Sequence, residues 1–106
     1  MAKLAAIAFA KPQIAKVVVK ESYTFSTINT KKAHTIKNAN KMLDTGWEVT
    51  GIKTGYIEES GNCLITQVKG KTTGRTIVTV ILGAASAVKQ YADTESALSI
   101  GFANLL

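Results

Sequence analysis

One run of the sequence, residues 75–82, constrains the fold most, because it is apolar on both faces of an extended strand. The side chains responsible are Ile77, Val78, Val80, Ile81 and Leu82. A strand covered on both faces is typical of the centre of a sheet. Residues 63–68 predict a second strand, and the turn signal Ser60-Gly61-Asn62 joins it to an alternating strand over residues 47–54. The second half of the chain therefore predicts an antiparallel sheet, with a bulge or a close backbone approach at Gly51.

Residues 14–25 predict another, longer strand. The β-branched cluster Val17-Val18-Val19 favours extended backbone, and Tyr23 and Phe25 alternate with polar neighbours.

Residues 31–44 predict a helix, because apolar residues recur there at three- and four-residue spacing. The members of this stripe are Ala33, Ile36 and Leu43. Thr30 is suited to cap the helix N-terminus, and Gly46 is free to take the left-handed conformation that ends many helices.

Together these elements predict an α+β fold. It has an antiparallel sheet of four to five strands, the helix of residues 31–44 packed on one face, and an apolar, helical C-terminal segment. The predicted core consists of Val18, Ile36, Leu43, Trp47, Val49, Ile65, Val78 and Val80. A chain of 106 residues favours a single domain over residues 1–106. A loose N-terminal arm over residues 1–12 and an oligomerisation segment over residues 84–106 are options within it.

The two most apolar runs are too short to span a membrane as helices. Residues 4–10 and 76–88 both fall below the roughly 20 residues that a spanning helix needs. The sequence therefore predicts no membrane partner and a cytoplasmic location, with a virion as the alternative.

The scarcity of reactive side chains argues against an enzyme. Cys63 is the only cysteine and His34 the only histidine, which excludes disulfide frameworks and metal sites built on several such residues. Gly70-Lys71-Thr72 resembles the end of a phosphate-binding loop, but Ile65 stands where that motif needs a glycine. The prediction is a protein without catalytic residues, metal, cofactor or small-molecule substrate.

The net charge of +6 is unevenly distributed. Residues 1–41 hold eight lysines and a single acidic residue, Glu21, and residues 69–75 hold three more cations. Such clusters attract polyanions by counterion release, although lysines also serve simply to keep a small domain soluble. On the predicted helix, His34, Lys37 and Lys41 would form one exposed ridge.

Two functions are compatible with these features. The first is a small, non-enzymatic nucleic-acid-binding module whose phosphate contacts are Lys31, Lys32, Lys37, Lys41, Lys69, Lys71 and Arg75. The alternative is a structural, self-assembling subunit of a virion or filament. Either would be a homo-oligomer, with contacts through the apolar C-terminal residues Leu98, Phe102 and Leu105.

Overall fold

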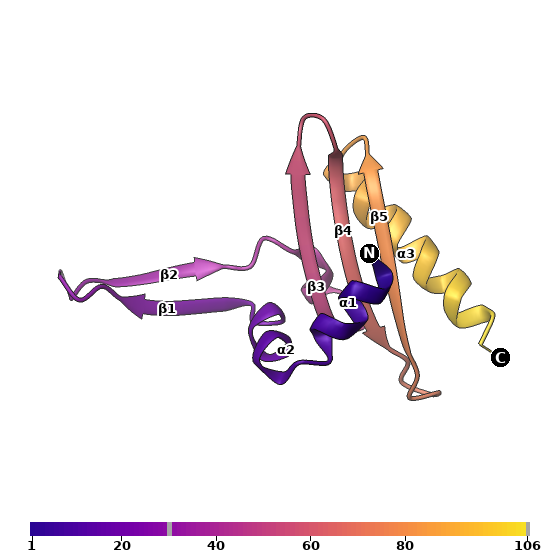
Figure 1. Cartoon of the computed structure of the whole chain (residues 1–106), viewed down its shortest axis with the longest axis horizontal. Coiled ribbons are helices and arrows are strands. Elements are labelled where there is room, and N and C mark those ends of the chain that lie inside the picture. Colours follow the sequence, from indigo (N-terminus) through magenta and orange to yellow (C-terminus); the bar gives the residue numbers. More distant parts are fainter. Residues whose placement is uncertain (30, 106) are drawn as a thin grey trace.

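The computed structural model describes residues 1–29 and 31–105 and shows an α+β fold with antiparallel sheets (Figure 1). In chain order the elements are α1 (Ala2–Phe9), α2 (Pro12–Val18), β1 (Ser22–Ser26), β2 (Ala33–Lys37), the 3-10 helix η1 (Lys41–Asp44), β3 (Glu48–Ile57), β4 (Gly61–Lys69), β5 (Thr76–Ala84) and α3 (Ala87–Ala103). Among the described residues, the predicted sheet of four to five strands is replaced by a two-stranded hairpin, β1–β2, and a three-stranded sheet in the order β3-β4-β5.

The three-stranded sheet corrects the position of residues 75–82. The strand that they form, β5, lies at an edge, and β4 takes the centre. Its two apolar faces have another cause, since α1 and α3 both pack against β5. Apolar residues on both faces therefore indicate a strand that is covered by a helix on each face, and they do not show whether the strand lies at the centre or at the edge of its sheet.

Helices α1 and α3 cover opposite faces of this sheet. A side chain at Gly51 would point at the ring of Phe9 in α1, whereas the neighbouring Ile52 packs in one cluster with Leu98 of α3. Successive side chains of a strand point to opposite faces, so the two helices lie on either side. Residues 1–12, for which a loose arm was an option, contain α1 and the start of α2, and α1 buries Ala5 and Phe9.

The core lies between the sheet and α3. It consists of Met42, Ile52, Leu64, Val68 and Leu98. Of the predicted core residues, Leu43, Trp47 and Val49 pack against this cluster. Ile36 was predicted wrongly, because its side chain is 58% exposed on the β1–β2 hairpin.

The predicted C-terminal helix is confirmed as α3. Its N-terminus is capped by Ser86, whose Oγ accepts a hydrogen bond from the Lys89 amide at 3.1 Å. Gln90, Thr94 and Leu98 recur every four residues and are its buried face. No helix within residues 1–29 and 31–105 is long and apolar enough to cross a membrane.

The helix predicted over residues 31–44 is not formed. Residues 33–37 are strand β2, paired with β1 so that Tyr23 faces Ile36 and Phe25 faces His34. Pairing with the preceding strand overrides the helical spacing, and the Thr24 and Thr35 hydroxyls hydrogen-bond across the hairpin at 2.8 Å. The proposed cap, Thr30, lies outside the described residues.

The strand predicted over residues 14–25 is divided in two. Pro12 stands in the first turn of α2, where its fixed φ favours a helix and its missing amide costs nothing. The helix ends at Val18, and extended backbone begins only at Ser22. The valine cluster therefore lies at the end of a short helix, against its strand propensity.

The predicted irregularity at Gly51 is confirmed, since the β3–β4 register shifts between Val49 and Gly51. A Cβ at position 51 would overlap the Phe9 ring, with Cδ1 at 2.8 Å. We expect Gly51→Ala to lower the free energy of unfolding by about 1–3 kcal/mol through overpacking, measured by urea denaturation. The matched control is Gly55→Ala in the same strand, where a Cβ meets no atom within 4 Å. Equal loss of stability in both variants would contradict this explanation.

Candidate active site

The candidate site is the middle of the edge strand β3. Lys53, Thr54 and Gly55 stand there, opposite Ile65, Leu64 and Cys63 of β4. Within the described residues β3 pairs with β4 alone, so its other backbone edge has no strand partner. An unpaired edge offers amide and carbonyl groups to an extended peptide.

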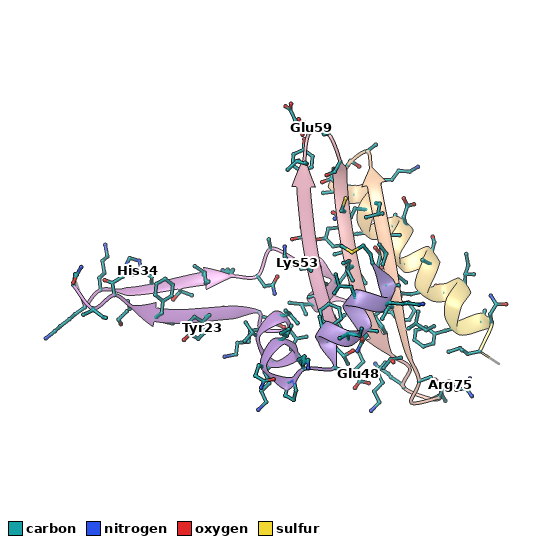
Figure 2. The ribbon with its side chains drawn as sticks, viewed as in Figure 1. Tyr23, His34, Glu48, Lys53, Glu59 and Arg75 are labelled. Carbon is teal, nitrogen blue, oxygen red and sulfur yellow. The ribbon has the colours of Figure 1, made fainter. Side chains whose placement is uncertain are left out.

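Lys53 brings a positive charge to this edge. Its side chain is exposed, and its ammonium donates a hydrogen bond to the carbonyl oxygen of Thr54. No carboxylate in the described part of the chain forms an ion pair with it. Figure 2 shows Lys53 on the side of β3 toward the β1–β2 hairpin, away from α3. The ammonium is therefore available to an anionic group outside the chain.

No contact within the described structure explains why residue 55 of β3 is a glycine. Glycine weakens a strand interior, and it is usually found there where another group approaches closely. At Gly51 that group is the Phe9 ring, but beside Gly55 the space is open. The need for a glycine at position 55 therefore points to a group that docks against β3 from outside.

The basic residues predicted to bind phosphate lie on separate elements. Lys31 and Lys32 lie in the β1–β2 connection, Lys37 ends β2, and Lys41 begins η1. The other three, Lys69, Lys71 and Arg75, lie at the end of β4 and in the loop that follows, at the opposite end of the molecule from His34 (Figures 1 and 2). The ridge of His34, Lys37 and Lys41 does not exist, because alternate residues of β2 face opposite sides.

The single cysteine and histidine are also far apart in the topology. Cys63 is half-buried on β4, while His34 stacks on Phe25 of the hairpin with ring centroids 5.5 Å apart. In the part of the chain that the structure describes, no three His, Cys, Asp or Glu side chains are arranged to hold a metal.

The residues predicted as oligomer contacts contribute to the fold of one chain. Leu98 is fully buried in the core, and Phe102 stacks on Trp47 at 5.9 Å between centroids. Leu105 is half-buried beyond the end of α3. The apolar side chains of the C-terminal segment thus pack against the β3-β4-β5 sheet of the same chain.

Comparison with known proteins identifies the family. Residues 1–86 match the family model of the D-alanyl-D-alanine carboxypeptidases. The chain belongs to this family. No curated protein matches the sequence.

Solved structures agree with the family model. A Streptomyces DD-transpeptidase is 27% identical over 96% of this chain, with a TM-score of 0.87, and the match covers 40% of that protein. A penicillin-binding protein of Listeria monocytogenes, solved in its cefotaxime-bound form, is 26% identical over 92% of this chain, with a TM-score of 0.73 and 36% of its own length covered. The chain thus spans about 40% of the length of the first relative.

These findings correct the function predicted from the sequence. The non-enzymatic nucleic-acid-binding module is wrong, and so is the alternative of a structural virion or filament subunit, because the chain belongs to a family of peptidases. The predicted partners are corrected with them, including the expectation of no small-molecule substrate. The cytoplasmic location and the single domain stay predictions.

The decisive signal was Lys53-Thr54-Gly55. Penicillin-binding proteins combine three motifs, S-x-x-K with the nucleophilic serine, S-D-N and K-T-G. The strand predicted over residues 47–54 includes Lys53 and Thr54 and ends before Gly55, and none of the three was given a role. A three-residue motif indicates a site only when it lies on an open strand edge, and the composition of the chain does not show where that edge is.

The sequence pattern S-x-x-K also occurs in this chain, at Ser86-Ala87-Val88-Lys89. Ser86 caps α3, and α3 packs on the face of the sheet to which Ile52 points, whereas the neighbouring Lys53 points to the opposite face. The two motifs do not meet. This match is a helix cap rather than a nucleophile.

Proposed function

We propose that this chain forms the β3 wall of the substrate site in a serine peptidase that acts on peptides ending in D-alanyl-D-alanine. The observation that carries the proposal is the K-T-G sequence of residues 53–55 on an unpaired strand edge, in a chain of the D-alanyl-D-alanine carboxypeptidase family.

Lys53 is suited to bind the C-terminal carboxylate of such a peptide. Its ammonium is exposed and forms no ion pair in the described residues. A charge-assisted hydrogen bond to a carboxylate is roughly twice as strong as a neutral one. The half-buried Thr54 hydroxyl adds a second donor at the next position along the strand.

The backbone of β3 is suited to hold the rest of the peptide. An extended peptide adds to a sheet edge through main-chain hydrogen bonds, and its position along the strand is fixed by a few side-chain contacts. The open space beside Gly55 allows a substrate backbone to approach closely. Lys53 and Gly55 together would then place the terminal peptide bond of the substrate next to the strand.

In this proposal, the serine that attacks the peptide bond is not part of the site formed by residues 53–55. Ser86 is excluded because it caps α3 on the face of the sheet opposite to Lys53, and the match covers only 40% of the Streptomyces enzyme. The positive charge of Lys53 would help to stabilise the negative charge that develops when a serine oxygen attacks the peptide carbonyl. The described site therefore accounts for substrate binding, which is testable on this chain, and the attack on the peptide bond requires a serine from outside the site.

The test is a titration of the chain with diacetyl-L-lysyl-D-alanyl-D-alanine, followed by backbone amide NMR. We expect the largest shifts at residues 53–56, and no such shifts with the L-alanyl-L-alanine isomer. Gly55→Ala should weaken binding while leaving the free energy of unfolding within about 0.5 kcal/mol of the parent, because no atom of the chain lies against its Cβ position. Shifts confined to other elements, or none at all, would refute the proposed site.

A further inference from the structure

The β1–β2 hairpin is the part of the molecule that its fold explains least. It projects from the body of the protein along the longest axis of the molecule, whose principal-axis extents with the hairpin included are 54 × 34 × 25 Å (Figure 1). Every residue of both strands is exposed. A two-stranded hairpin on its own is only marginally stable in water, so one that projects this far is expected to serve a surface.

The connection between the two strands carries an apolar side chain that packs on nothing. Ile28 is 97% exposed, the highest value among the large apolar residues given for this chain. Lys31 follows it with a positive φ of 53°, a conformation that is unfavourable for a residue with a Cβ. An exposed isoleucine in a strained turn stabilises nothing in the isolated chain.

The charge around this isoleucine is mainly positive. Residues 20–37 hold four lysines, Lys20, Lys31, Lys32 and Lys37, against the single carboxylate of Glu21. Behind the turn, Tyr23 and Phe25 are 52% and 39% exposed, and the Lys20 ammonium lies 5.1 Å from the centre of the Tyr23 ring. The sequence along the hairpin is therefore an apolar tip, then cations, then aromatic rings.

We propose that the tip of the β1–β2 hairpin binds the surface of an anionic lipid bilayer. Ile28 would enter the boundary between headgroups and acyl chains, while Lys31 and Lys32 remain at the level of the lipid phosphates. This inference does not depend on the proposed peptidase function.

The arrangement fits a lipid surface better than a protein partner. A protein interface buries its centre, and lysines are depleted there because each would lose water without a compensating charge. A bilayer surface accepts one apolar side chain and leaves the neighbouring lysines hydrated. The positive charge of the hairpin complements anionic lipids and not neutral ones.

The test is co-sedimentation of the full chain with vesicles of phosphatidylglycerol and phosphatidylcholine, compared with vesicles of phosphatidylcholine alone. We expect binding to the anionic vesicles only, weakening as salt is raised. The double variant Lys31→Gln/Lys32→Gln should bind about 30-fold more weakly, at roughly 1 kcal/mol per lysine. Ile28→Ser should weaken binding by about tenfold or more.

Two variants serve as matched controls. Lys69→Gln/Lys71→Gln removes the same charge from the end of β4 and the loop that follows it, and Ile100→Ser removes an isoleucine that is 63% exposed on α3. Both should bind the anionic vesicles as the parent does. The proposal is overturned if the parent does not bind, if the controls lose as much affinity as the hairpin variants, or if Ile28→Ser instead dissociates a dimer of the chain.

Discussion

Replacing Lys53 with alanine is expected to weaken binding of the D-alanyl-D-alanine peptide by about 10- to 150-fold. The range corresponds to the loss of a hydrogen bond to a charged group, about 1.5–3 kcal/mol. The side chain is exposed and its one hydrogen bond in the chain is to the neighbouring carbonyl oxygen of Thr54, so the fold should be unaffected. Isothermal titration calorimetry measures the affinity, and urea denaturation measures stability.

The control for this experiment is Lys69→Ala. Lys69 is an exposed lysine at the end of the neighbouring strand, opposite Glu48 at the start of β3. It tests whether any lost cation on this sheet reduces affinity for an anionic peptide. Equal losses from both variants would show that attraction is general to the basic surface, and Lys53 would then have no specific role in the site.

Replacing Leu98 with alanine is expected to lower the free energy of unfolding by about 2–5 kcal/mol. The side chain is 0% exposed and is the buried contact of α3 with the core that includes Leu64 and Val68. Truncating it removes buried apolar area and leaves a cavity that the strands cannot close. Urea denaturation gives the change directly.

The control is Ile100→Ala, two residues further along α3 on its exposed side. It should remain within about 0.5 kcal/mol of the parent. This pair also separates a core residue from an oligomer contact. If Leu98 joined two chains, the stability of the parent would rise with protein concentration and the loss in the variant would depend on concentration.

The second half of the fold was largely predictable because its signals are local. Ser60-Gly61-Asn62 lies at the β3–β4 turn, where Gly61 has a φ of 70° that glycine accepts without strain. The first half was not predictable, because Ala33 and Ile36 have a helical spacing and fall on opposite faces of the strand that actually forms. Pairing with residues 22–26 decides between helix and strand, and a single sequence does not display that pairing.

The candidate site was missed for a different reason. The prediction rested on the number of lysines, and the tertiary structure distributes them over the hairpin, η1, the end of β4 and the loop that follows it. Lys53 was given no role, and it is the only lysine of residues 42–68, outside both clusters of basic residues. The role that we propose for Lys53 rests on the open edge of β3 and on the glycine at position 55, neither of which depends on net charge.

The sequential order of the three-stranded sheet has a consequence for how the chain reaches its native state. Each strand pairs with the next one along the chain, so closing β3 onto β4 and β4 onto β5 requires only short loops. Contacts between near neighbours in sequence carry a small loop-closure entropy and form rapidly. We expect this meander to form early, with α1 docking across it later. The strand that carries Lys53 would then be in register before the rest of the first half of the chain is in place.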